Sequence, residues 1–357
     1  MQEFQRKLEH IRVLMKKRQI YGLLISQQKN FSWLTSGRGF VNQATERAVG
    51  TILVTLDSTC LIANNIEAVR LMEEEVQAEF DQVEVFAWHE PTRLNEIISR
   101  LVGDERVAWD TELETDFIAL RSVLTSREKE RIRRLAQDTA QALEQTAFDI
   151  QTGETEFQIA SRLAAHCIKR GIEPIVNLVA ADLRVFSRRH PLPTSKPLDN
   201  YAMLVIGGRR QGQIVSASRL VHFGRPSDDL LYRQKAVATV DAAMISHTVP
   251  GTHFSDLFVH MKEAYQAVGF ADEWKYHHQG GLSGYLSREQ LLLPDISQQV
   301  QRDQVYAWNP SIAGVKSEDT IMITEQGTEV LTFTGQYPMV EVEWNGQRIE
   351  RPGILIR

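Results

Sequence analysis

The second half of this chain repeats one order of expected elements, and this repeat constrains the fold more than any single motif. Two amphipathic helices, over 126–150 and 155–171, come before an antiparallel strand pair within 201–224. Two further helices, within 228–268, come before strands between 305 and 333. Hydrophobic residues at helical or alternating spacing mark these segments. Helix pairs that alternate with antiparallel strands predict an α+β domain in which helices back a sheet.

The first part of the chain follows a different pattern. An amphipathic helix over 4–19 leads into strands that alternate with helices, which predicts a smaller α/β sheet domain. Thr125 and Glu128 then form a capping-box signature that opens the next helix. A chain of 357 residues favours two domains over one, and we place them at residues 1–124 and 125–357.

The composition excludes several classes of protein. The formal net charge is −6 and the basic residues are interspersed with acids, so no surface for nucleic acid is indicated. No apolar run approaches the ~20 residues of a membrane span, and the charged N-terminal segment is unlike a signal peptide. Cys60 and Cys167 lie far apart and form no metal or redox motif. We expect a cytoplasmic protein that binds neither nucleic acid nor a membrane.

Segment 277–285, His-His-Gln-Gly-Gly-Leu-Ser-Gly-Tyr, combines two histidines with three glycines, which indicate tight turns or close backbone approach. Together with segments 308–310 and 316–320, it resembles the C-terminal half of the pita-bread metallopeptidases. These include aminopeptidase P, prolidase, methionine aminopeptidase and their metal-free relative creatinase. Residues 30–37 resemble a turn in the N-terminal domain of the creatinase/prolidase group. The resemblance implies an α+β fold, a C-terminal pita-bread domain after a smaller α/β creatinase N-terminal-type domain, and a homodimer.

The resemblance also implies which positions would hold the two metal ions of these enzymes. The two aspartate motifs fall on Val205 and Ser216, with the family's spacing between them. The family histidine falls on Gly281, and the glutamate before proline falls on Asn309. Only Glu318 matches the metal-binding residue that the family has at its position. Valine and glycine side chains cannot bind a cation, and a neutral serine or amide is a poor substitute for a carboxylate. We therefore predict no dinuclear metal centre and no cofactor.

Other residues match positions that touch substrate in the family. His190 resembles the first pocket histidine, the acid/base group of creatinase, and an imidazole with a near-neutral pKa suits proton transfer. We expect His278 and Glu318 to complete the catalytic group by orienting substrate and water. The expected substrate-binding residues on the same pocket are Asn309, Arg219, Tyr285 and His277.

Structural interpretations of some of these residues stay open. Glu318 and Arg219 can form a purely structural ion pair, and one of the two adjacent histidines can simply pack in the protein. Arg288 and Glu289 are interpreted as a solvated pair rather than as pocket residues.

Three functions remain compatible with the sequence. The first is a metal-independent hydrolase of a small peptide, amide or guanidino-like compound, similar to Xaa-Pro aminopeptidases and prolidases. The second is a non-catalytic protein that binds a peptide or metabolite in the same pocket. The third is a genuine Xaa-Pro metallopeptidase. All three take a small-molecule or short-peptide ligand.

Overall fold

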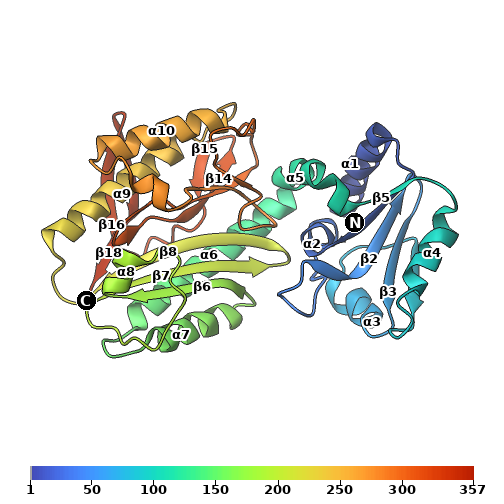
Figure 1. Cartoon of the computed structure of the whole chain (residues 1–357), viewed down its shortest axis with the longest axis horizontal. Helices are drawn as coiled ribbons and strands as arrows, with labels where there is room; N and C mark the ends of the chain where they lie inside the picture. Colours follow the sequence, from blue (N-terminus) through green and yellow to red (C-terminus); the bar gives the residue numbers. More distant parts are fainter. Residues whose placement is uncertain (1) are drawn as a thin grey trace. The chain divides into compact units, whose positions relative to one another are not determined.

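A computed structural model of the chain describes residues 2–357, which form two compact units. The N-terminal unit extends to Arg121 and includes residues 211–213, and the C-terminal unit comprises residues 122–210 and 214–357. Figure 1 shows the helices and strands of each unit. The two units have different sheets and are described separately.

The N-terminal unit is built on a five-stranded sheet with the order β4-β3-β2-β1-β5. Strands β1, β2 and β3 pair antiparallel, whereas β4 and β5 join the edges in parallel. Buried aliphatic residues of β1, β3 and α4 form part of its core. The elements are α1 (Gln2–Arg18), β1 (Gly22–Gln27), β2 (Arg47–Thr55), β3 (Thr59–Asn64), β4 (Gln82–Phe86), α4 (Arg93–Val102), β5 (Val107–Trp109) and α5 (Glu114–Ser122).

One segment of this unit differs from the expected turn. Residues 30–37 belong mostly to a helix, α2 (Gln28–Thr35), which ends where Ser36 takes a left-handed conformation. Asn30 is fully buried, and its Nδ2 donates a hydrogen bond to Asp110 Oδ2 at 2.8 Å. Tertiary burial of a short helix therefore replaces the turn that local sequence suggested.

The C-terminal unit contains two larger sheets, with the orders β18-β8-β7-β6 and β10-β9-β11-β14-β15. The pairings of β6 with β7, and of β9, β10, β11, β14 and β15 in their sheet, are antiparallel, while β18 joins β8 in parallel. The strands are β6 (Glu173–Ala181), β7 (Tyr201–Arg210), β8 (Gln213–His222), β9 (Gly280–Ser283), β10 (Gln290–Leu291), β11 (Val305–Trp308), β14 (Asp319–Thr324), β15 (Gly327–Val330) and β18 (Ile354–Ile356).

Two helix pairs back these sheets, as the sequence predicted. The expected capping box is present at Thr125 with Glu128, and a second one forms at Thr155 with Gln158. Helices α6 and α7 pack on β7 and β6, while α9 packs against α10 and the hairpin of β16 and β17 (Figure 1). These elements are α6 (Ser126–Asp149), α7 (Glu156–Ile168), α9 (Asp228–His247), α10 (Phe254–Ala267), β16 (Met339–Trp344) and β17 (Gln347–Pro352).

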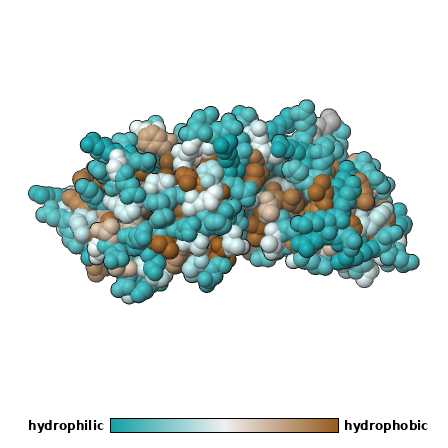
Figure 2. Space-filling view, turned by 90° about the horizontal axis from the view of Figure 1, so that it is seen from above, coloured by the Kyte–Doolittle hydropathy of each residue, from teal (hydrophilic) through white to brown (hydrophobic). Residues whose placement is uncertain are grey.

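Hydrophilic side chains cover most of the face shown in Figure 2, and hydrophobic side chains form small separate groups there. Over residues 2–357, no helix combines the length and the apolar character needed to cross a membrane. Cys60 and Cys167 are both buried free thiols.

Candidate functional site

A cavity of about 120 Å³ in the C-terminal unit brings together most of the residues singled out in the sequence. Strands β6 and β7 supply its apolar lining, Val176, Leu178, Val205 and Ile206. Its polar lining comes from separate segments and consists of His190, Ser216, His278, Ser287, Arg288, Asn309, Lys316 and Glu318. The expected convergence of His190, His278, Asn309 and Glu318 is therefore present in the fold.

The glycines of β9 let the neighbouring strands approach so closely that a side chain there would clash. A Cβ atom at Gly280, which has φ +99°, would lie 2.1 Å from the carbonyl oxygen of Ala307 on β11. A Cβ at Gly281 would lie 2.0 Å from the carbonyl oxygen of Gln290 on β10. Position 281 therefore has no room for a histidine in this backbone arrangement.

Glu318 is held by two cations inside the cavity. Its Oε2 lies 3.0 Å from Lys316 Nζ and accepts a hydrogen bond from Ser218 Oγ at 2.5 Å, and its Oε1 lies 3.2 Å from Arg288 Nη2. Burial alone would raise the pKa of this carboxyl, but the charges of Lys316 and Arg288 outweigh it and lower the pKa. Glu318 is thus an ionised, fully engaged carboxylate rather than one free to hold water.

Three histidines lie beside this charge cluster. The Nε2 atoms of His277 and His190 are 3.0 Å apart, and the ring of His278 stacks on that of His277 with a centroid distance of 4.6 Å. Loss of surrounding water, with a smaller effect of nearby cations, lowers the pKa of His190 and lowers that of His278 to about 4. His277 is more buried, and its pKa is lowered further for the same reasons. All three imidazoles are therefore neutral near pH 7.

These imidazoles are also the one place where several ligand-type side chains meet within residues 2–357. One nitrogen from each of His190, His277 and His278 lies within 4.8 Å of the others. No comparable group of Asp or Glu side chains accompanies them in the described chain. The donor set suits at most one ion that prefers nitrogen ligands.

Three of the four expected substrate-binding residues, Arg219, Tyr285 and His277, do not line the cavity, which corrects that expectation. His277 lies next to the cavity, against His190, whereas the other two face helix α6. Tyr285 is buried and its hydroxyl donates a hydrogen bond to Glu128 Oε1 at 2.6 Å. Arg219 pairs with Glu144 at 2.9 Å and with Asp319 at 3.0 Å, not with Glu318. Arg219, on β8, and Tyr285, in the segment after β9, each bind a residue of helix α6.

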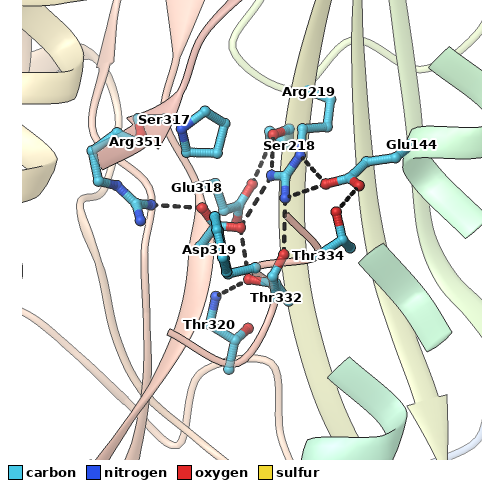
Figure 3. Close-up of polar contacts among 12 residues, drawn as sticks. Glu144, Ser218, Arg219, Ser317, Glu318, Asp319, Thr320, Thr332, Thr334 and Arg351 are labelled. Atoms are coloured by element: carbon cyan, nitrogen blue, oxygen red, sulfur yellow. Dashed lines mark hydrogen bonds and ion pairs between the residues drawn. The ribbon is translucent and has the colours of Figure 1, made fainter. Parts of the chain in front are cut away.

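Arg219 belongs to a buried ion network behind the cavity (Figure 3). Arg351 reaches Asp319 from the other side at 2.7 Å, and Thr332 donates to Asp319 at 2.6 Å. Arg219 also donates to the carbonyl oxygen of Ser218, whose hydroxyl binds Glu318. The network therefore fixes the backbone on which Glu318 and Ser218 stand.

The structure shows two pocket residues that sequence reasoning missed. Arg288 was interpreted as solvated, but only 12% of its side chain is exposed and it binds Glu318. Lys316 received no role, although it stands two residues before Glu318. A period of two places both side chains on one face of an extended segment, and this was the available signal. The cavity is richer in positive charge than the sequence suggested.

Lowering the pH should destabilise the protein through His277. Its pKa lies below the ordinary 6.5 in the folded state, so the unfolded chain takes up the proton first and stability falls as the pH drops below 6.5. His277→Gln should remove about 1 kcal/mol of the stability difference between pH 7.5 and 5.5, measured by urea unfolding. His89→Gln, at an exposed site, is the matched control. An unchanged pH dependence in His277→Gln would contradict the assignment.

Comparison with known families agrees with this architecture. The family model described as metallopeptidase family M24 matches residues 130–325, more than half of the chain, and that of the creatinase/prolidase N-terminal domain matches residues 7–130. The chain belongs to metallopeptidase family M24. As an M24 protein it has the predicted pita-bread domain after a creatinase-type N-terminal domain.

Solved structures of low sequence identity share the fold of this M24 protein. The prolidase from Pyrococcus horikoshii OT3 superposes with a TM-score of 0.77 at 18% identity, over 92% of this chain and 98% of that one. The Xaa-Pro dipeptidase from Bacillus anthracis gives 0.77 at 17% identity, over 99% and 100%. The N-terminal domain of FACT complex subunit SPT16 from chickpea gives 0.73 at 13% identity, over 93% and 96%.

Curated relatives of this M24 protein match only in part. An uncharacterized peptidase of Staphylococcus haemolyticus is 23% identical over 225 residues, which cover 60% of this chain and 63% of that protein. One of Staphylococcus epidermidis is 27% identical over 125 residues, which span 34% of its length. These matches support a peptidase-like M24 protein.

Proposed function

We propose that this M24 protein is a prolidase-like hydrolase of a small peptide or amide that works without a dinuclear metal centre. The observation that carries the proposal is the pairing of both Glu318 oxygens with Lys316 and Arg288. Glu318 is the one carboxylate left at the family's metal-ligand positions, and its charge is already balanced by protein cations.

The residues at the expected ligand positions do not fit two divalent ions. Val205 offers no ligand atom, and Gly281 has no room for a side chain. The Oγ of Ser216 lies 3.4 Å from Nη1 of Arg288, so a guanidinium already occupies its surroundings. A further positive charge about 4 Å from such a cation would be repelled by roughly 4 kcal/mol at an effective dielectric constant of 20.

His190 is the group best suited to move the proton in this pocket. Its lowered pKa leaves the imidazole neutral at pH 7, and it lines the cavity beside His278. It would accept a proton from water as the water oxygen bonds to the amide carbon. The same proton would pass to the amide nitrogen as the C–N bond breaks, giving an acid and an amine. Lys316 and Arg288 would supply positive potential, with Glu318 as their positioning residue.

Hydrolysis should persist after metal removal. The protein would be treated with 1,10-phenanthroline, an uncharged chelator, and its metal content measured before and after by elemental analysis. Cleavage of a dipeptide and small-amide panel should then be unchanged in the stripped protein and unaffected by added Mn²⁺, Co²⁺ or Zn²⁺. A matched incubation without chelator controls for loss of activity with time.

Other outcomes of that experiment identify the alternatives. Two tightly bound equivalents of metal, with activity that returns only on reloading, would establish a genuine metallopeptidase and overturn the proposal. Binding of panel compounds without turnover would instead support a binding protein that uses the same pocket. One equivalent that disappears in His277→Ala would place a single ion at the histidine group.

A further inference from the structure

We propose that the cavity binds the carboxylate group of its ligand between Lys316 and Arg288, so that an anion enters where the family resemblance places metal cations. The anion site rests on the proposed function in one respect, because both require that the two metal ions are absent. Its other grounds are the charge of the cavity lining and the unpaired hydrogen-bond donors there. It names the ligand class as a small carboxylate that carries an adjacent N–H group.

The charge of the cavity lining favours an anion. Lys316 and Arg288 contribute two positive charges, and Glu318 contributes one negative charge. His190 and His278 are neutral near pH 7 because their pKa values are lowered. The lining therefore keeps a net positive charge, and the charged side chains that carry it are at most 12% exposed. Such a buried charge attracts an anion more strongly than a charge on the surface.

Both cations have donor capacity left after pairing with Glu318. The Lys316 ammonium carries three N–H donors, its side chain is only 3% exposed, and its ion partner is the single carboxylate of Glu318. The Arg288 Nε is buried and has no hydrogen-bond partner. An unpaired buried donor on a charged group is costly, and a ligand carboxylate would satisfy donors from both residues.

Asn309 adds an acceptor to these donors. It is 2% exposed, lines the cavity, and its Oδ1 has no hydrogen-bond partner. An N–H group close to the ligand carboxylate would pair with this oxygen. The apolar side chains of Leu178 and Val205 line the same cavity and suit a short hydrocarbon segment.

The cavity volume limits the size of the ligand. Sites for drug-sized compounds measure roughly 300–1,000 Å³, whereas this cavity measures about 120 Å³. It accommodates the carboxyl end of a molecule of amino-acid size. N-acyl amino acids and the C-terminal residue of a short peptide have this combination of carboxylate, N–H and small body.

Matched ligands test the proposal on the unaltered protein. Binding of N-acetylglycine and of N-acetylglycinamide would be measured by calorimetry at pH 7.5 after metal removal on a chelating resin. A resin is preferable because soluble polycarboxylate chelators would compete for the site. The two ligands differ in the negative charge, and N-acetylglycine should bind at least about ten-fold more tightly, a difference of 1.4 kcal/mol. Equal affinities, or no binding of either ligand, would overturn the proposal.

Substitutions locate the anion on the two cations. Lys316→Met and Arg288→Met should each abolish the preference for N-acetylglycine, whereas Lys316→Arg should retain it. Arg348→Met is the control, because it removes the same charge from a side chain that is 73% exposed on β17. If a methionine variant loses its native circular dichroism, the comparison of the two ligands on the unaltered protein decides alone. A preference that survives in folded Lys316→Met and Arg288→Met would also overturn the site.

Failure of this inference is distinguishable from failure of the proposed function. Carboxylate-selective binding without any turnover would refute the hydrolase and leave the anion site intact. Metal-independent turnover with no preference between the two ligands would refute the anion site and leave the hydrolase intact. Recovery of two metal equivalents that block N-acetylglycine binding would refute both.

Discussion

Replacement of Arg219 by methionine is expected to lower the free energy of unfolding by about 3–5 kcal/mol, the usual cost of leaving a buried charge without its partner. The Arg219 side chain is 1% exposed and binds Glu144, Asp319 and the carbonyl oxygen of Thr332 (Figure 3). Methionine fills much of the volume but leaves Glu144 without its cation and leaves Asp319 with Arg351 as its one cationic partner among the described residues. Urea unfolding at pH 7.5 measures the change.

Arg225→Met provides the matched control for this experiment. Arg225 is 88% exposed and lies 3.9 Å from Asp228, which is 93% exposed, so its loss should change stability very little. A change for Arg219→Met as small as that of the control would show that the network in Figure 3 contributes little to stability. Such a result would also show that the network is not what holds Ser218 and Glu318 in place.

His190→Ala is expected to lower turnover by about 10²–10⁴-fold, the range of general acid–base catalysis. The His190 ring is exposed at the cavity, so the free energy of unfolding should change little. Turnover by the unaltered protein should rise with pH along an acidic limb whose midpoint lies below pH 6.5, because the pKa of His190 is lowered and the neutral ring is the active form. The measurement is kcat/KM for the best substrate of the panel between pH 4.5 and 8.

His253→Ala is the control, since His253 lies outside the cavity lining and forms a hydrogen bond with Gln299 instead. Equal turnover in His190→Ala and His253→Ala would assign proton transfer to another group. An acidic limb centred above pH 6.5 would contradict the lowered pKa of His190.

Local sequence patterns were sufficient for most of the secondary structure. The capping box at Thr125 begins α6 as predicted, and one at Thr155 begins the predicted second helix, α7. Such a signal can be found in the sequence because the side chain and backbone groups that form a capping box lie within four consecutive residues. The dipeptide Asn345-Gly346, a local signal for a type I′ turn, joins β16 and β17 with both residues at positive φ. The helix α2 was missed, because its stability comes from burial of nearly all its residues rather than from helix propensity.

The candidate site was only partly determined by the sequence. The family resemblance implied that His190, His278, Asn309 and Glu318 would converge, and these four residues line one cavity. The partners of each charge could not be assigned in this way. A pair of Arg219 with Glu318 was one interpretation of the sequence. In the structure Arg219 binds Asp319 on the network side, and Lys316 and Arg288 bind Glu318 on the cavity side.

The sequence by itself determined the α+β architecture, the M24 resemblance and the absence of ligand-type side chains at positions 205 and 281, since these depend on residue identity and order. Only the tertiary structure decided the electrostatic character of the pocket. Adjacent side chains of an extended strand point to opposite faces, so Glu318 and Asp319 enter different environments although they are neighbours. Which cation each one meets depends on strands and loops that are distant in sequence, and burial then decides how strongly each pair acts.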